Sequence, residues 1–296
     1  MWSRPTRQLI EIACDEDLGS AGDITSTLLP GGTADVTARV FSRAAGIICG
    51  LALGPAVCEV FSKRLGRPLE FAPQADDREW QDGAAVTPGT AVATVRGALE
   101  AVLAVERTLL NFLGRMSGVA TLTHSYVQAA RAIRADVKIL DTRKTIPGWR
   151  ELDKYAVHAG GGKNHRMGLH DAVLIKDNHL ADIPVESIAT TLTDLLSRIR
   201  GAPTFFEVEV DNPQQLTEVC AVPGVDIVLL DNFSLDQMRA AVAYRDAQGL
   251  LGKLALEASG GVTLDTVTEI AATGVDRISI GALTHSAPNL DIGLDL

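Results

Sequence analysis

The chain has little cysteine, and the few cysteines that it has are not arranged in pairs. The four are widely spaced and form no CxxC motif: Cys14, Cys49, Cys58 and Cys220. Disulfide frameworks and zinc sites have characteristic short cysteine spacings, and none is present. We therefore expect reduced, buried thiols, as is usual in a cytoplasmic protein.

Positive charge and long hydrophobic runs are also scarce. The 27 Lys and Arg residues are outnumbered by 37 Asp and Glu residues, which gives a net charge of −10. This balance argues against nucleic acid or an anionic membrane as the main partner. The uncharged run Ala44–Cys58 is broken by glycines and falls short of the roughly 20 residues that a membrane span needs. Residues 1–7 lack the apolar core of a signal peptide, so we expect a soluble, cytoplasmic protein.

Hydrophobic residues, by contrast, make up 46% of the 296 residues, which is enough for one large domain or two ordinary ones. The first hundred residues mix helical and alternating patterns. The segments predicted there are a helix over 4–19, strands over 33–43 and 46–50, a helix over 55–65 and further strands within 68–96. We predict an N-terminal α+β sandwich domain over residues 1–116.

A long helical tract follows over residues 99–134. Apolar residues at helical spacing, such as Leu99, Val102 and Leu113, indicate a helix that connects the first domain to the rest of the chain. Gly114 and Gly118 are expected to break this tract in two, because glycine is a poor helix former.

From Val137 onward, apolar strands alternate with helices, which is typical of a parallel sheet. The predicted helices cover 187–200, 213–220, 235–248 and 264–273, with N-caps at Asn212, Ser234 and Thr263. About six strands are visible, so residues 117–283 are predicted to form an incomplete or irregular (β/α) barrel rather than a closed one. The tail, 284–296, is too short for another unit and is expected to pack on the first domain.

Each of the six apolar runs ends on residues that can bind charged groups. The carboxyl ends of parallel barrel strands lie at one mouth, where active sites are found. The candidate residues near these ends are Thr142, Arg143, Lys144, Lys176, Glu209, Asp231, Ser259, Gly260, Gly261 and Gly281. We therefore expect them to surround one site.

The candidates separate by charge. The cations are Arg143, Lys144, Lys176, His165 and Arg166, and guanidinium groups suit carboxylates and phosphates. The last two follow three consecutive glycines within residues 159–166, which would let the backbone approach a ligand or move.

The anions and glycines complete the predicted site. Glu209 and Asp231 can hold Mg²⁺, which prefers oxygen ligands and substrate phosphates. The Ser259-Gly260-Gly261 run offers N–H groups to a phosphate. Together with the cations, they suggest a sugar phosphate that carries a diphosphate leaving group.

Each residue also has a purely structural interpretation, because strand ends are often solvated and carboxylates often pair with lysine. A Schiff-base enzyme that uses Lys144 or Lys176 is a second possibility. A phosphosugar-binding regulator without catalytic activity is a third.

Several segments of the chain match the motifs of one enzyme family in order. They are GDITS, VERTLLNFLGRMSGVAT, DTRKTIPGWRELDKYAV, GGGKNHRMGLHDAVLIKDNH, FEVEVDN, VLLDNF, LEASGGV and SIGALTHS. On these motifs the chain resembles the quinolinate phosphoribosyltransferases over nearly its whole length. A molybdenum-transport-associated paralogue has the same fold, but the full cation set favours a dicarboxylate acceptor.

The resemblance implies a six- or seven-stranded barrel, a homodimer and Mg²⁺-dependent transfer of phosphoribose from phosphoribosyl pyrophosphate to quinolinate, with loss of CO₂. It assigns the catalytic roles to Lys144, Lys176, Glu209 and Asp231, and the last two also to metal binding. The remaining candidates would bind substrate, and Arg107 would reach into the partner subunit's site.

Overall fold

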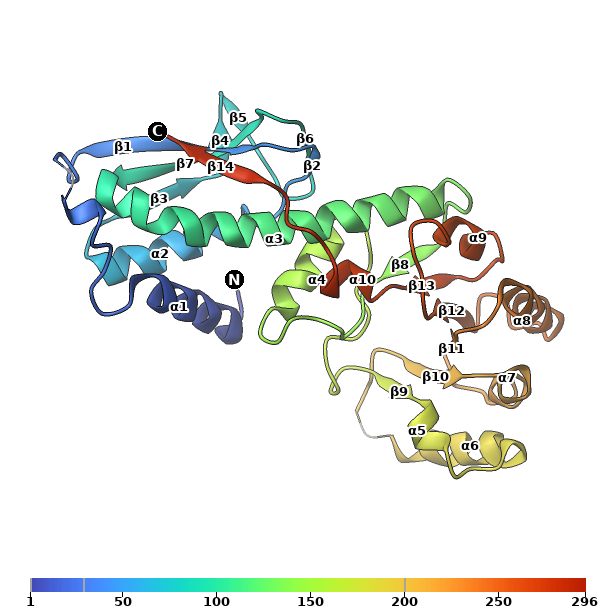
Figure 1. Cartoon of the computed structure of the whole chain (residues 1–296). Helices are drawn as coiled ribbons and strands as arrows, with labels where there is room; N and C mark the ends of the chain where they lie inside the picture. The colour runs from blue at the N-terminus through green and yellow to red at the C-terminus, as the bar shows by residue number, and fades with distance from the viewer. Residues whose placement is uncertain (1, 29, 200) are drawn as a thin grey trace. The chain divides into compact units, whose positions relative to one another are not determined.

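The computed structural model describes residues 2–28, 30–199 and 201–296, and these form two compact units (Figure 1). The first unit comprises residues 1–124, 145–161 and 283–296, and the second comprises residues 125–144 and 162–282. The division falls after His124, whereas we expected the first domain to end at residue 116, and residues 145–161 join the first unit.

The first unit contains helices and short strands. They are α1 (Arg4–Leu18), η1 (Ser26–Leu28), β1 (Asp35–Ser42), β2 (Gly46–Ile47), α2 (Gly54–Leu65), β3 (Leu69–Ala72), β4 (Gln74–Ala75), β5 (Arg78–Glu79), β6 (Ala85–Val86), β7 (Ala91–Ala98), α4 (Arg150–Ala159) and β14 (Ile292–Asp295). Ser3 caps α1 by accepting a hydrogen bond from the Thr6 N–H, and α2 ends at Gly66, which has left-handed φ.

A four-stranded antiparallel sheet organises this unit, in the order β14-β1-β7-β3. Its buried residues are mostly apolar, among them Ala38, Val40, Ala93 and Val95, and the polar Ser42 is buried with them. Strand β14 belongs to the C-terminal tail and pairs with β1, so Leu294 lies opposite Val40. The tail thus closes one edge of the first unit's sheet.

The long helix α3 (Leu99–Arg131) is continuous, so the predicted break at Gly114 and Gly118 is wrong. The two glycines serve close packing instead. A Cβ at Gly118 would lie 1.9 Å from the Pro288 carbonyl oxygen, and one at Gly114 would lie 3.0 Å from that of Leu290. The helix therefore tolerates the glycines because the tail backbone packs directly against it.

The second unit alternates strands and helices. Its elements are β8 (Lys138–Leu140), β9 (Val173–Ile175), α5 (Asp177–Leu180), η2 (Val185–Ser187), α6 (Ile188–Arg198), β10 (Phe206–Val210), α7 (Pro213–Cys220), β11 (Ile227–Asp231), α8 (Leu235–Ala247), β12 (Ala255–Ser259), α9 (Val267–Ala271) and β13 (Arg277–Ser279). The short α10 (Ala282–His285) follows at the boundary with the first unit.

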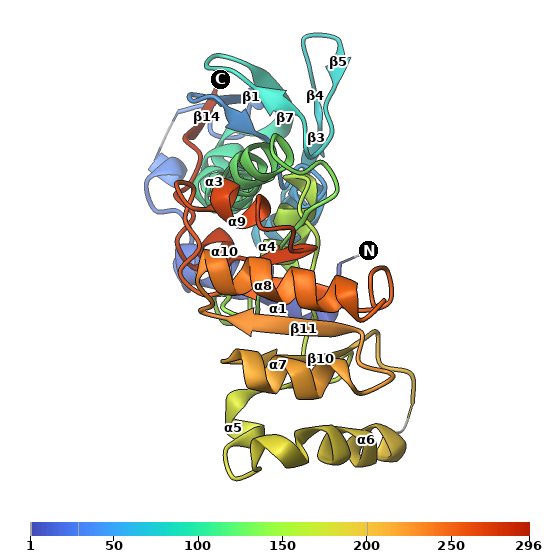
Figure 2. The same ribbon diagram turned by 90° about the vertical axis from the view of Figure 1, so that its right-hand side faces the viewer.

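The six strands form one parallel sheet in the order β8-β13-β12-β11-β10-β9 (Figures 1 and 2). Among the described residues no ladder joins β8 to β9, so the barrel is open there. Helices α6, α7 and α8 run along the outer side of the sheet. The predicted fold class, an irregular barrel with an additional α+β domain, is confirmed.

Two of the three predicted helix caps are confirmed. The Asn212 side chain accepts from the Gln215 N–H, and Ser234 accepts from the Gln237 N–H. The helix predicted from residue 264 begins only at Val267, because Thr263 and Thr266 bond to each other in a preceding turn. The helix predicted over 187–200 is α6, and residue 200 lies outside the described residues.

No helix within the described ranges is both long enough and apolar enough to cross a membrane.

Candidate active site

A cavity of about 470 Å³ lies at the carboxyl ends of the barrel strands, entirely within the second unit. Its lining comprises Thr142, Arg143, Lys144, His165, Arg166, Leu174, Lys176, Glu209, Leu229, Asp231, Glu257, Ser259 and Ser279. The structure therefore gathers nine of the predicted site residues around one cavity. The glycines at 260 and 261 directly follow Ser259, and Gly281 follows two residues after Ser279.

The strand register explains why these side chains meet. In the parallel sheet, Glu209 lies opposite Leu229, and Leu229 lies opposite Glu257. Asp231 lies opposite Ser259 in the same way. Because side chains alternate between faces along a strand, residues two apart share a face. One face of the sheet therefore carries the cavity, and the alternate residues pack under the helices.

The predicted catalytic lysine and glutamate form an ion pair. Lys176 Nζ lies 2.5 Å from Glu209 Oε2, and the Glu209 side chain is only 8% exposed. The Lys176 side chain is 44% exposed, so its ammonium is within reach of a ligand in the cavity. Lys176 follows the end of β9 directly, which places the pair at the mouth of the barrel.

The other predicted acid, Asp231, is held by its neighbours. Asn232 Nδ2 donates to Asp231 Oδ2 at 2.8 Å, and the Asn232 N–H donates to the Ser259 carbonyl at 3.0 Å. Asn232 has a φ of 54°, and a Cβ at Gly260 would lie 2.0 Å from its Oδ1. Gly260 is therefore needed for the contact between these two loops, which in turn positions Asp231.

Two arginines supply positive charge without a counter-ion from the protein. Arg166 is buried, and burial, followed by the charge of nearby Arg143, lowers the pKa of its guanidinium. Within the described part of the chain, no carboxylate lies within ion-pair distance of either guanidinium, and Arg143 Nε is buried without a hydrogen-bond partner. Such a pair suits an anion with two carboxylates.

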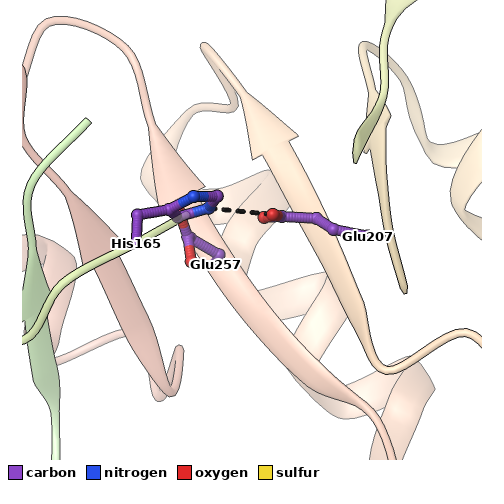
Figure 3. A group of neighbouring side chains, drawn as sticks. All are labelled: His165, Glu207 and Glu257. Atoms are coloured by element: carbon purple, nitrogen blue, oxygen red, sulfur yellow. Dashed lines mark ion pairs between the residues drawn. The ribbon is translucent and has the colours of Figure 1, made fainter. Parts of the chain in front are cut away.

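His165 lies between this cationic side of the cavity and a buried acidic cluster (Figure 3). Its Nε2 is 2.8 Å from Glu207 Oε2 and 3.5 Å from Glu257 Oε1. Burial lowers the pKa of His165, but the contact with Glu207 and the charges of Glu257 and Glu207 outweigh it, so the pKa is raised. Burial and then the charge of Glu257 raise the pKa of Glu207.

Sequence reasoning did not place Glu207, Glu257 or Arg277 among the site residues. Glu207 and Glu257 lie on strands whose predicted ligand-binding residues were Glu209 and Ser259, and Arg277 lies on the strand before Gly281. The alternation could have identified two of them, because Glu207 is two residues before Glu209, and Glu257 is two residues before Ser259.

The remaining predicted residues differ in how they relate to the cavity. Thr142 Oγ1 accepts from the Lys144 N–H at 3.0 Å, which shapes the loop after β8. Arg107 lies in the first unit on α3, its side chain is 67% exposed, and Glu106 is 3.9 Å away. The first of the three glycines, Gly160, packs against α3, since a Cβ there would lie 2.4 Å from the Ala120 oxygen.

Comparisons with known proteins cover nearly the whole chain. Residues 23–117 match the profile of the quinolinate phosphoribosyl transferase N-terminal domain, and residues 119–295 match that of the C-terminal domain. The nicotinate-nucleotide pyrophosphorylase [carboxylating] of Mycobacterium leprae is 42% identical, over 98% of this chain and 96% of its own.

Solved structures agree with the sequence relatives. The crystal structure of NadC from Streptococcus pyogenes has a TM-score of 0.87 and 32% identity, and the match covers 100% of this chain and 98% of that one. The nicotinate-nucleotide pyrophosphorylase of Francisella tularensis gives a TM-score of 0.82 at 35% identity, over 98% of this chain and 95% of its own.

Proposed function

The chain belongs to the quinolinate phosphoribosyl transferase family, and we propose that it transfers phosphoribose from phosphoribosyl pyrophosphate to quinolinate. The products are nicotinate mononucleotide, diphosphate and CO₂. The observation that carries the proposal is the cavity in which two arginines without protein counter-ions face Glu209, Asp231 and the Ser259 loop. Quinolinate has two adjacent carboxylates, which match the two guanidinium groups.

Positioning and electrostatics supply the catalysis in this account. Loss of diphosphate from the ribose C1 builds positive charge on the sugar, and Glu209 and Asp231 lie where they can stabilise it. Lys176 and Lys144 stabilise the departing diphosphate. Once the pyridine nitrogen has attacked C1, its positive charge stabilises the carbanion left when the adjacent carboxylate departs as CO₂, and this carbanion takes up a proton from water to give the product. No dedicated acid or base is needed, so most of the rate enhancement comes from orientation.

We further propose that the reaction uses Mg²⁺. The donor set suits it, because Glu209 and Asp231 offer carboxylate oxygens to the same cavity, and Mg²⁺ is commonly held by one or two carboxylates with substrate phosphates. When bound, the ion would neutralise charge on the diphosphate. Lys176 already compensates Glu209, so Asp231 is the acid with more capacity for the ion. Activity is expected to vanish with a chelator and to return with added Mg²⁺.

The proposed reaction has a direct assay. Quinolinate labelled at the C2 carboxylate should release labelled CO₂ only when both phosphoribosyl pyrophosphate and Mg²⁺ are present. Nicotinate is the matched control substrate, because it lacks that carboxylate and leaves one guanidinium without a ligand. Absence of labelled CO₂ from the complete mixture would reject the function.

We also propose a homodimer in which Arg107 reaches the partner's cavity. The support is that Arg107 is exposed, and that the same unit exposes large apolar side chains at Ile12, Ile24 and Leu28. Mixed dimers of Arg107→Ala and Lys144→Ala subunits should recover part of the activity that each variant alone loses. No recovery in re-formed mixed dimers would remove the shared site.

A cytoplasmic location is the final part of the proposal. Its support is that the structure shows all four cysteines as free thiols, which is typical of a reducing compartment. A Schiff-base mechanism that uses Lys176 gains no support, because the Lys176 amine is engaged by Glu209.

A further inference from the structure

A buried charged cluster adjoins the cavity, which Glu257 helps to line, and has no role in the reaction described above. It consists of Glu207 on β10, Glu257 on β12 and Arg277 on β13, and it surrounds the ring of His165. Both glutamates are 0% exposed. Buried charges are costly unless they are paired and hydrogen-bonded, so a cluster of this kind calls for an explanation.

The contacts form a chain that begins at the strands of the barrel and ends at Arg166 in the cavity wall. Arg277 Nε lies 2.5 Å from Glu257 Oε2, and Glu207 faces His165 Nε2 at 2.8 Å (Figure 3). On the other side of the ring, His165 Nδ1 accepts the backbone N–H of Arg166 at 2.8 Å. Both ring nitrogens are thus engaged within the protein, and the residue beyond the ring is Arg166.

This arrangement selects one form of the imidazole. A nitrogen that accepts a hydrogen bond carries no proton, so a neutral ring must carry its proton on Nε2, toward the glutamates. Among the described residues, both oxygens of Glu207 and Oε1 of Glu257 are buried without a hydrogen-bond partner, and the ion-pair contacts of Glu207 Oε2 and Glu257 Oε1 are both with His165 Nε2. The two carboxylates therefore have the ring as their common partner.

The rest of the ring's surroundings hold it in place. The backbone N–H of His165 donates to the buried carboxylate of Asp141 at 2.9 Å. The Phe205 ring meets the imidazole edge-on with centroids 5.2 Å apart, and the Arg277 guanidinium lies over the same Phe205 ring. The charged side chains next to the ring are thus Glu207, Glu257 and Arg277 from the strands, while Asp141 accepts the backbone N–H of His165 and Arg166 meets the ring through its own backbone N–H.

We propose that Glu207 and Glu257 are positioning residues that act through His165 to hold Arg166 in place for one carboxylate of the substrate. This inference rests on the proposed function, because it assumes that Arg166 binds a dicarboxylate. It changes the role expected for His165, whose ring orients the arginine instead of offering a nitrogen to the ligand. The diphosphate and ribose contacts of the cavity lie outside this chain of interactions.

Steady-state kinetics of two Glu207 variants test the proposal. Glu207→Met keeps the volume and removes the acceptor, so the KM for quinolinate should rise about 10- to 100-fold, since a small misplacement of a binding group can cost about 100-fold. The KM for phosphoribosyl pyrophosphate should change little. Glu207→Gln retains an oxygen acceptor for Nε2–H and should recover most of the loss. The exposed Glu186→Gln is the matched control.

Nitrogen-15 NMR of the histidine rings gives a second readout that works on the unmodified enzyme. The His165 signal, assigned by its loss in His165→Gln, should show a protonated Nε2 and an unprotonated Nδ1 at neutral pH. Glu207→Met should shift the ring toward a mixture of tautomers.

Several results would overturn the proposal. They are an unprotonated Nε2 in the wild-type protein, a tightly bound metal ion at His165, Glu207 and Glu257, or equal effects of Glu207→Met on both KM values. If wild-type enzyme releases no CO₂ at all, the proposed function fails. If the wild type is active and Glu207→Met matches it, only the positioning role fails.

Discussion

The two sheets of this protein bury different chemistry. In the antiparallel sheet of the first unit, the buried side chains are apolar, as in Val40 and Val95, with the exception of Ser42. In the parallel sheet of the second unit, one row of alternate residues is equally apolar, including Val208 and Leu256. The other row lines the cavity and is mainly charged or hydroxylic, although Leu174 and Leu229 belong to the lining as well. One sheet thus serves only stability, whereas the other divides stability and chemistry between its faces.

The difference teaches that the position of a charge, rather than its presence, determines its role. Charges on the cavity face are maintained at a cost to stability, because polar groups there replace apolar packing. Neutral substitutions on that face should therefore reduce activity and leave folding nearly intact. Substitutions in the apolar rows, or at charges outside the cavity, should lower the free energy of unfolding and leave the activity of the folded protein nearly unchanged.

The largest effect is expected for Lys176→Met. Removing a charge that stabilises a departing anion typically costs about 100- to 1,000-fold in kcat. The thermal midpoint should change less than the activity, because the Lys176 side chain is 44% exposed at the cavity, although Glu209 loses its ion-pair partner. Steady-state assays and thermal melts measure both quantities. Lys253→Met, at an exposed lysine of the same unit, is the control, and an equal loss there would break the comparison.

Arg245→Met tests a buried charge of the second unit that lies away from the cavity. Arg245 is 2% exposed, and its Nη1 lies 2.5 Å from Asp276 Oδ2. Removing Arg245 leaves Asp276 with Arg134 as an ion-pair partner at 3.2 Å, so the free energy of unfolding should fall by about 1–3 kcal/mol. Urea titration measures the fall. The folded variant should keep its kcat, and a large drop in kcat would show that location does not separate the two roles.

The glycines of α3 give a graded test of packing in the first unit. Gly118→Ala would bring a Cβ to 1.9 Å from the Pro288 oxygen, and Gly114→Ala would bring one to 3.0 Å from the Leu290 oxygen. Gly118→Ala should lower the free energy of unfolding by about 1–3 kcal/mol, the usual range for overpacking. Gly114→Ala should cost less. If both variants were stabilising, as alanine is in an exposed helix, the close approach of the tail would be contradicted.

The cysteines provide the smallest effect and a pH dependence. Burial raises the pKa of Cys58, in the first unit, to about 12 and that of Cys220, in the second, to about 11. Iodoacetamide at pH 8 should therefore react slowly with both in the native protein and quickly in denaturant.

The sign of the corresponding stability change follows from linkage. Above about pH 9 the unfolded thiols lose protons before the folded ones, so the free energy of unfolding should fall as the pH rises toward 12. Urea titrations at pH 8 and pH 10 measure it, with Cys58→Ala as the comparison. Equal losses in the variant would assign the pH dependence to other groups.

Local sequence patterns predicted the structure correctly where that structure depends only on residues close in sequence. Asn212 and Ser234 cap their helices as predicted, because a cap involves only the next three residues. The charged strand ends could be grouped because parallel strands share a direction, and the cavity contains them.

The errors came from partners distant in sequence. The continuity of α3 at Gly118 depends on Pro288, which no local pattern reveals. The roles of Glu207 and Glu257 depend on a loop histidine that reaches into the barrel. Only the residues nearest the carboxyl ends of their strands were predicted to bind a ligand, so the charged face was recognised only there. Because every second residue of a strand lies on the same face, counting back two residues along each strand would have added Glu207 and Glu257 to the predicted charged face.

A crystal structure with quinolinate bound tests the central claim most directly, namely that the charged face of the second unit is the substrate site. The account predicts ligand density in the cavity, with one carboxylate on the Arg143 guanidinium, the other on that of Arg166, and His165 still facing Glu207. Quinolinate bound in another cavity, or bound in this one without contact to either arginine, would contradict it.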